Sequence, residues 1–395
     1  MRFRTAAAVL GLMVGCFLAA PAEAQEEKEW GYNKGFFFRT PDFELKISTR
    51  TQFRYTLTNF DETSAFEDRQ DFTIPRARLR LDGFAFRPWI KYKVQYDFTG
   101  QVYNSVTGIN IPGNFTCDPA ATEPCEEPDQ TVSLGVRTGP DLRDLYFDIT
   151  RNPWASVRLG QFKAPFGVQE LTSSGDQQFV DRSIASALFA PSRDQGVMLY
   201  GTSFGKAFGY EAGLFNGNFR NRSANDNDKL LYAARVHWDP NGEYKLSESA
   251  VDHPTTPNYT FSLGYLLNWP DSAGELKQDT REGMFGLKYL RFSVLVDAYL
   301  RTQESASGDV DSEGYNAQIG VFLIPSKLEV AGRWSRTDPN TSLEDNEQTE
   351  TRLGFGYYFN KHDLKVQADY GRIRNEASAT DTTTDIFRAQ FQIVF

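Results

Sequence analysis

The feature that most constrains this chain is an alternation of apolar and polar residues, repeated in segments of about ten residues from Glu44 to Phe395. Each segment stops at a turn or a loop, as is typical of strands that cross a membrane in a closed β-barrel. The alternation therefore predicts an all-β fold, a 16-stranded antiparallel transmembrane β-barrel that forms one domain over residues 25–395. The predicted strands cover residues 44–58, 72–86, 89–102, 141–151, 154–163, 196–204, 208–216, 229–239, 258–268, 282–290, 291–302, 312–324, 326–337, 349–360, 362–373 and 384–395.

The connections between these segments alternate in length. Both termini of a bacterial barrel lie in the periplasm, so periplasmic turns are short and the outer loops are long. Tight turns are predicted at residues 87–88, 152–153 and 360–361, whereas residues 103–140 form a long loop. Residues 240–257 break the rule. They are either a long periplasmic excursion or a sign that the strand count slips there.

The N-terminus predicts export. Arg2 and Arg4 precede an uncharged run over residues 6–20, and small residues then lead to a cleavage site before Gln25. These features predict a signal peptide over residues 1–24. A lipoprotein signal around Cys16 is the alternative, but the apolar run continues past this cysteine. No later apolar run is long enough for a helical membrane span.

Charged side chains share one face of the predicted strands. Arg76, Arg78 and Arg80 alternate with apolar residues, and a charge facing lipid at the bilayer midplane costs about 2–4 kcal/mol, so the charged face is the lumen. The candidate anion-binding residues, chosen by this parity and from the connection after residue 163, are Arg50, Arg54, Arg76, Arg78, Arg80, Lys91, Lys93, Arg158, Lys163, Arg182, Arg193 and Arg235.

Rows of cations in a narrow pore favour anions, and the guanidinium fork suits phosphate. The alternative is that these cations pair with lumen acids, such as Asp82 and Asp97, and only hold the wall together. The net charge of −10 does not argue against an anion channel, because many acids fall in the predicted loops. It does argue against nucleic acid as a partner.

The long connection over residues 164–195 is predicted to fold inward and narrow the lumen, since ordered loops of this length are usually functional. A surface loop that closes the top of the barrel is the alternative.

In an oxidising compartment, Cys117 and Cys125 are predicted to form a loop disulfide. Neither a metal site nor a cofactor motif is expected.

Catalysis has one weak signal, the Gly-x-Ser-x-Gly pattern at residues 201–205. This nucleophile motif requires a strand followed by a helix, but here it ends a predicted barrel strand. A structural or adhesive barrel with a closed lumen is a second alternative to a channel.

Several motifs resemble those of one family, the phosphate-selective porin O and P family. The central match runs from Arg158 to Ser174. Further matches lie at residues 35–38, 76–80, 92–97, 179–183, 193–197 and 214–218. The resemblance implies a homotrimeric, sixteen-stranded barrel in the outer membrane, with a basic ladder and inward-folded loops. Its implied substrate is phosphate or a related small anion. Arg76, Arg78, Arg80, Lys163 and Arg182 lie within the matching motifs.

The sequence thus predicts an outer-membrane porin with a water-filled channel for small anions, and not an enzyme. A barrel without anion preference is the alternative. The expected partners are the lipids of the outer membrane, small anions such as phosphate, and further copies of the chain.

Overall fold

The computed structural model describes residues 29–62, 66–99, 140–222, 224–270, 274–305, 308–377 and 380–395. The predicted signal peptide over residues 1–24 and the predicted Cys117–Cys125 disulfide lie outside these ranges and stay predictions.

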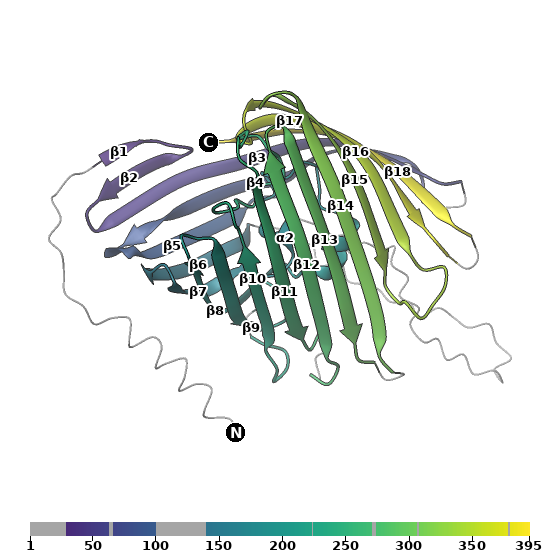
Figure 1. The fold of residues 1–395 in the computed structure, drawn as a ribbon, viewed down its shortest axis with the longest axis horizontal. Coiled ribbons are helices and arrows are strands. Elements are labelled where there is room, and N and C mark those ends of the chain that lie inside the picture. Colours follow the sequence, from purple (N-terminus) through teal and green to yellow (C-terminus); the bar gives the residue numbers. More distant parts are fainter. Residues whose placement is uncertain are drawn as a thin grey trace.

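A closed antiparallel barrel forms the body of the molecule (Figure 1). Each strand from β3 onward pairs with the next, and β18 pairs with β3, which closes the sheet. The prediction of sixteen barrel strands is confirmed, with strand ends within five residues of the expected positions. The strands are β3 (Phe43–Phe60), β4 (Arg69–Ala85), β5 (Arg87–Asp97), β6 (Asp141–Asn152), β7 (Ala155–Lys163), β8 (Arg193–Ser203), β9 (Phe208–Phe215), β10 (Leu231–Trp238), β11 (Asn258–Asn268), β12 (Gln278–Tyr289), β13 (Phe292–Gln303), β14 (Val310–Ile324), β15 (Leu328–Asp338), β16 (Gln348–Asn360), β17 (Leu364–Asn375) and β18 (Thr382–Val394).

Alternation along each strand separates an apolar outer face from a polar inner face. In β18, Phe387 and Phe391 are exposed on the outside, whereas Arg388, Gln390 and Gln392 are buried inside. The outer face meets lipid and the inner face meets water and other protein groups, so a period of two satisfies both surroundings. Among the described residues, no helix is long and apolar enough to cross a membrane.

A short hairpin precedes the barrel and was not predicted from the sequence. It consists of β1 (Glu29–Tyr32) and β2 (Phe36–Thr40), and it projects beyond one rim of the barrel (Figure 1). Strand β2 pairs with residues 43–47 of β3 along the same edge that β18 pairs with from Arg50 onward. The hairpin therefore supplies backbone partners where β18 has already ended.

Residues 164–192, named here the inserted loop, run inside the barrel. They contain α2 (Val168–Leu171) and α3 (Ile184–Phe189), the latter capped by the Ser183 hydroxyl, which accepts a hydrogen bond from the Ser186 amide. Phe189 stacks on Tyr299 of β13 with ring centroids 5.5 Å apart. Apolar contacts of this kind hold the inserted loop on the inner face of β12–β18, named here the packed wall.

Residues 240–257 connect β10 and β11 at the rim where the short turns lie. The strand count is therefore right, and this segment is a long excursion at the short-turn end. It folds back into the barrel, where Leu246 packs against Val168, Met284 and Leu295. Two segments that enter from opposite ends thus fill the same half of the lumen.

Candidate functional site: a cation-lined cavity inside the barrel

A cavity of about 560 Å³ remains between the inserted loop and the inner face of β3–β9, named here the open wall. Among the described residues, its lining contains twelve Lys and Arg side chains but five Asp and Glu side chains. The cations are Lys34, Lys46, Arg50, Arg76, Arg78, Arg80, Lys93, Arg143, Arg158, Lys163, Arg182 and Arg193, and the acids are Asp144, Glu170, Asp176, Glu211 and Asp363. The open space is therefore positively charged, although the chain as a whole is acidic.

The middle of the cavity is built by two arginines that converge on the inserted loop. Arg50 and Arg78 occupy directly opposed positions of β3 and β4. Both donate to the hydroxyl oxygen of Ser174, over 3.4 Å and 3.1 Å. A side chain on Gly175 would bring its Cβ within 2.6 Å of the Arg50 Cζ. Glycine at this position lets the loop pass close to the guanidinium.

Arg78 and Arg80, which follow each other on the inner face of β4, each have an acidic partner. Arg78 donates to Asp97 over 2.8 Å, and the Arg80 Nε lies 2.5 Å from Asp82. One carboxylate cannot occupy all five N–H groups of a guanidinium. These arginines keep donors for a second acceptor, and both line the cavity.

Farther around the wall, Asp144 is shared by two cations. Its oxygens lie 2.8 Å from the Lys93 Nζ and 2.6 Å from the Arg193 Nε. Arg158 pairs with Asp148 over 2.7 Å and stacks 4.1 Å from the centroid of the Tyr146 ring. These pairs hold the cations in fixed positions on the wall.

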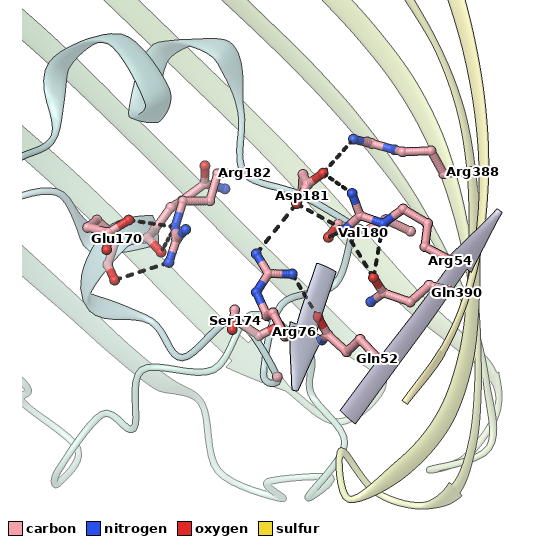
Figure 2. A network of polar contacts seen from close by, with 12 residues as sticks. Gln52, Arg54, Arg76, Glu170, Ser174, Val180, Asp181, Arg182, Arg388 and Gln390 are labelled. Atoms are coloured by element: carbon pink, nitrogen blue, oxygen red, sulfur yellow. Dashed lines mark hydrogen bonds and ion pairs between the residues drawn. The ribbon is translucent and has the colours of Figure 1, made fainter. Parts of the chain in front are cut away.

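Asp181 of the inserted loop joins three arginines (Figure 2). Its carboxylate lies 2.8 Å from Arg54, 3.0 Å from Arg388 and 3.6 Å from Arg76. Burial by itself would raise the pKa of Asp181, but the surrounding guanidiniums outweigh it and hold the pKa well below its usual range. The ionised carboxylate thus fastens the loop to β3, β4 and β18.

Lys163 and Arg182 bind the inserted loop itself. The Lys163 ammonium donates to the carbonyls of Glu170, Leu171 and Thr172. Arg182 donates to the Gln169 carbonyl over 2.8 Å and lies 3.1 Å from the Glu170 carboxylate. Burial would raise the pKa of Glu170, but Arg182 and Lys163 lower it below its usual value. Both cations line the cavity while they shape its edge.

Three of the predicted residues do not line the cavity. Arg54 is engaged by Asp181, Lys91 is exposed on β5, and Arg235 pairs with Glu211 over 3.2 Å.

Three cavity cations were missed by sequence reasoning. Lys46 shares the parity of Arg50 and could have been found by extending the alternation. Arg143 lies beside a register shift in the pairing of β5 with β6, and Lys34 lies in the hairpin turn, so parity indicates neither.

On the packed wall, the inward cations are bound by acids of the wall or by backbone carbonyls of the segments that fill the lumen. Arg352 lies 2.7 Å from Glu350 and 2.8 Å from Asp369, and Arg333 lies 2.8 Å from Glu350. Lys365 donates to the Gln177 carbonyl of the inserted loop over 2.8 Å. None of these three cations and two acids lines the cavity.

A closed sixteen-stranded barrel with an apolar outer face and a charged cavity inside defines an outer-membrane porin. Solved structures with the same fold include the anion-selective porin from Comamonas acidovorans, with a TM-score of 0.58 and 12% identity over 90% of this chain and 100% of that chain. The outer membrane channel DcaP of Acinetobacter baumannii has a TM-score of 0.56 and 12% identity, over 90% of this chain and 98% of that chain. OprB of Pseudomonas putida has a TM-score of 0.57 and 9% identity, over 90% and 94%.

A curated protein of Aquifex aeolicus (strain VF5) is 23% identical over 377 residues, which cover 88% of this chain and 87% of the relative. The sequence profile described as "Phosphate-selective porin O and P" matches residues 47–395. The chain belongs to this family, and it is an outer-membrane anion channel. Family and fold indicate a channel rather than an enzyme, and the Gly-x-Ser-x-Gly pattern lies where β8 ends in a turn.

Proposed function

We propose that this porin takes small oxyanions, with phosphate preferred, and that the cations of the open wall select them. The observation that carries the proposal is the cavity lining, in which the described part of the chain places twelve cations against five acids. Lys46 and Arg50 add to it, since neither has a carboxylate oxygen within 4.0 Å among the described residues. Their charge is left for a permeating anion.

Phosphate fits this arrangement better than a halide does. Arg50 and Arg78 converge on Ser174, so an oxyanion beside them meets two guanidiniums and a hydroxyl group. Guanidiniums bind tetrahedral oxyanions through paired hydrogen bonds. Arg80 follows on the same face about 6–7 Å away, which offers the next step along the wall. Several modest sites permit both binding and release.

The neighbour from Comamonas acidovorans is described as anion-selective, and the family description names phosphate. Both support the proposal without identifying the residues responsible. The twelve predicted candidates are therefore ranked by their contacts. Arg50, Arg76, Arg78 and Arg80 come first, since they line the cavity from two adjacent strands.

The test is a planar-bilayer measurement on the purified porin. In a potassium chloride gradient we expect the reversal potential to show anion preference. Millimolar phosphate should then reduce the chloride current, because phosphate stays longer at the arginines. Arg50→Ala should weaken this block several-fold, whereas Lys91→Ala, which removes an exposed cation outside the cavity, should not. Equal permeability to both ions would contradict anion selection, and a chloride current indifferent to phosphate would contradict the phosphate preference.

We also propose that the barrel works as a homotrimer, as the family resemblance implies. The hairpin β1–β2 supports assembly, because Trp30, Tyr32 and Phe36 are exposed by 82%, 57% and 63%. A cluster of exposed aromatic side chains marks a protein or membrane interaction site, and this hairpin projects beyond the rim of the barrel. Unheated gel electrophoresis and mass photometry should give a trimer. Trp30→Ser combined with Phe36→Ser should shift the population toward monomer, and an unchanged trimer would remove the hairpin from the interface.

Two parts of the chain outside the described residues complete the proposal. We propose that residues 1–24 are removed as a signal peptide and that Cys117 and Cys125 form a disulfide. The intact mass of the mature protein should match a chain that begins at Gln25. It should show no alkylation of these cysteines without reductant, and two alkylated cysteines would exclude the disulfide.

A further inference from the structure

The periplasmic segment over residues 240–257 does more than connect two strands. It enters the lumen from the periplasmic end, opposite the end at which the inserted loop enters. Several contacts fix it to the packed wall. The Ser249 hydroxyl donates to Glu329 over 2.8 Å, and the Lys288 ammonium donates to the Lys245 carbonyl over 2.7 Å. Val251 packs in a cluster with Phe322 and Tyr358. The segment is therefore a rigid support and not a free turn.

One residue of this segment makes three hydrogen bonds to the inserted loop. The Glu248 carboxylate accepts from the Gln178 backbone amide over 2.8 Å and from the Gln169 side-chain amide over 3.3 Å. Its own backbone amide donates to the Asp176 carbonyl over 3.0 Å. Glu248 is 6% exposed, and among the described residues no Lys or Arg nitrogen lies within 4.0 Å of its carboxylate. Both of its oxygens are used by neutral donors of one loop.

The two clamp points bracket the stretch of the loop that borders the cavity. Gln169 lies before this stretch and Gln178 lies after it. Between them, Glu170, Ser173, Ser174 and Asp176 line the cavity. Ser174 is the residue on which Arg50 and Arg78 converge. Barrel residues also hold this stretch, since Gln392 donates to the Gly175 carbonyl over 3.0 Å and Lys365 donates to the Gln177 carbonyl over 2.8 Å. Glu248 adds the contacts that come from the periplasmic segment, on both sides of Ser174.

We propose that Glu248 is the positioning residue of the constriction, so that a periplasmic segment sets the width and the selectivity of the channel. The loop enters from the extracellular side, and its strand connections alone do not fix how far it reaches toward the open wall. Glu248 holds the loop from the periplasmic side, in addition to the contacts that Lys163 and Asp181 make with it. The inference rests on the proposed anion selection for one of its two readouts, selectivity. The other readout, conductance, does not depend on it.

The test compares Glu248→Ala, Glu248→Gln and Asp252→Asn in single-channel recordings. The alanine variant loses both carboxylate contacts, so we expect at least a twofold rise in conductance, a lower anion-to-cation permeability ratio and more frequent current fluctuations. The glutamine variant can still accept from the Gln178 amide, so its change should be smaller. Asp252 is the matched control. It is an acid of the same segment, it pairs with Lys361 over 2.6 Å, and no contact joins it to the inserted loop among the described residues.

The two readouts separate position from charge. If Glu248 acted only as a fixed negative charge, its neutralisation would raise the anion-to-cation ratio at unchanged conductance, in both variants alike. That result, or no change in either readout, would overturn the inference. Unheated gel mobility checks that the variants form barrels, and the glutamine variant keeps the test open if the alanine variant does not assemble. A wild-type channel without anion preference would contradict the proposed function, while the conductance comparison would still decide the role of Glu248.

Discussion

The two halves of the lumen obey the same strand parity and end in opposite states. On the open wall, Arg50 and Arg78 face a cavity and share a serine hydroxyl. On the packed wall, Arg333 and Arg352 point inward just as regularly, yet both are buried against Glu350. An inward cation is therefore available to a solute only where the segments inside the lumen leave it facing the cavity.

The difference comes from the two segments that fill one side of the barrel. Burying a charge without a partner costs several kcal/mol, so a wall covered by protein must supply a matching charge or carbonyl for each cation. The open wall faces water, and its cations need not be neutralised in full. The packed wall accordingly places Glu350 and Asp369 beside its arginines, whereas the cavity lining on the open wall has more cations than acids.

The largest effect is expected when charge is reversed on the open wall. Changing Arg76, Arg78 and Arg80 together to Glu would turn a lining of twelve cations and five acids into one of nine cations and eight acids. Reversal potentials in a salt gradient should shift from anion preference to near neutrality or to cation preference. The corresponding Gln variant, with nine cations and five acids, should fall between. A triple Glu variant that assembles and keeps its anion preference would show that this row does not control permeation.

A break in the packed wall should affect stability and leave selectivity nearly alone. Arg352→Met leaves Glu350 and Asp369 with fewer partners in a buried site. Loss of one member of a buried ion pair costs about 3–5 kcal/mol. The barrel should therefore unfold at a lower temperature on heated gels, while the folded channels keep the wild-type reversal potential. A stable variant with altered selectivity would erase the distinction between the two walls.

Acid should act on the contact that joins the two walls. The pKa of Asp181 is depressed in the folded state, so its ion pairs stabilise the loop fully above the unfolded pKa of about 3.9. This stabilisation is lost as pH falls below that value toward the folded pKa. Channel conductance should be constant from pH 7 to pH 4, where Asp181 keeps its charge, and change only at lower pH. Asp181→Asn should lack that part of the acid response, and an identical response in both proteins would assign it to other groups.

The smallest effect is expected from a cation that has lumen parity but lies outside the cavity. Lys91 is exposed on β5 and does not line the cavity, so Lys91→Gln should leave the permeability ratio within experimental error. The comparison with Arg50→Gln, measured in the same salt gradient, sharpens the contrast. Equal shifts in the two variants would mean that parity alone, and not access to the cavity, decides which cations matter.

Much of the fold was predictable because the bilayer imposes a simple rule. Every membrane-facing residue must be apolar and every backbone group must be paired, so strands, their number and their inner faces follow from alternation. The hairpin β1–β2 escaped prediction, since its run of Phe36, Phe37 and Phe38 does not alternate. The role of residues 240–257 also stayed open, since length alone does not tell whether a segment hangs outside the barrel or folds back into it.

The candidate site was predictable only in part. Nine of the twelve predicted cations line the cavity, which parity and the motif around Lys163 account for. Lys34 and Arg143 join them for reasons that are not periodic, namely a hairpin turn and a register shift. Arg54 is withdrawn by Asp181, a residue more than one hundred positions away in the sequence.

The sequence by itself determined which side of the barrel wall each strand residue faces, because the side-chain period of a strand is two and one face meets lipid. Only the tertiary structure decided which inward cations stay open to a solute. That choice depends on where the inserted loop and the periplasmic segment come to rest. Their positions are set by contacts between residues distant in the sequence, such as Glu248 with Gln178 and Asp181 with Arg388, and no local period encodes such contacts.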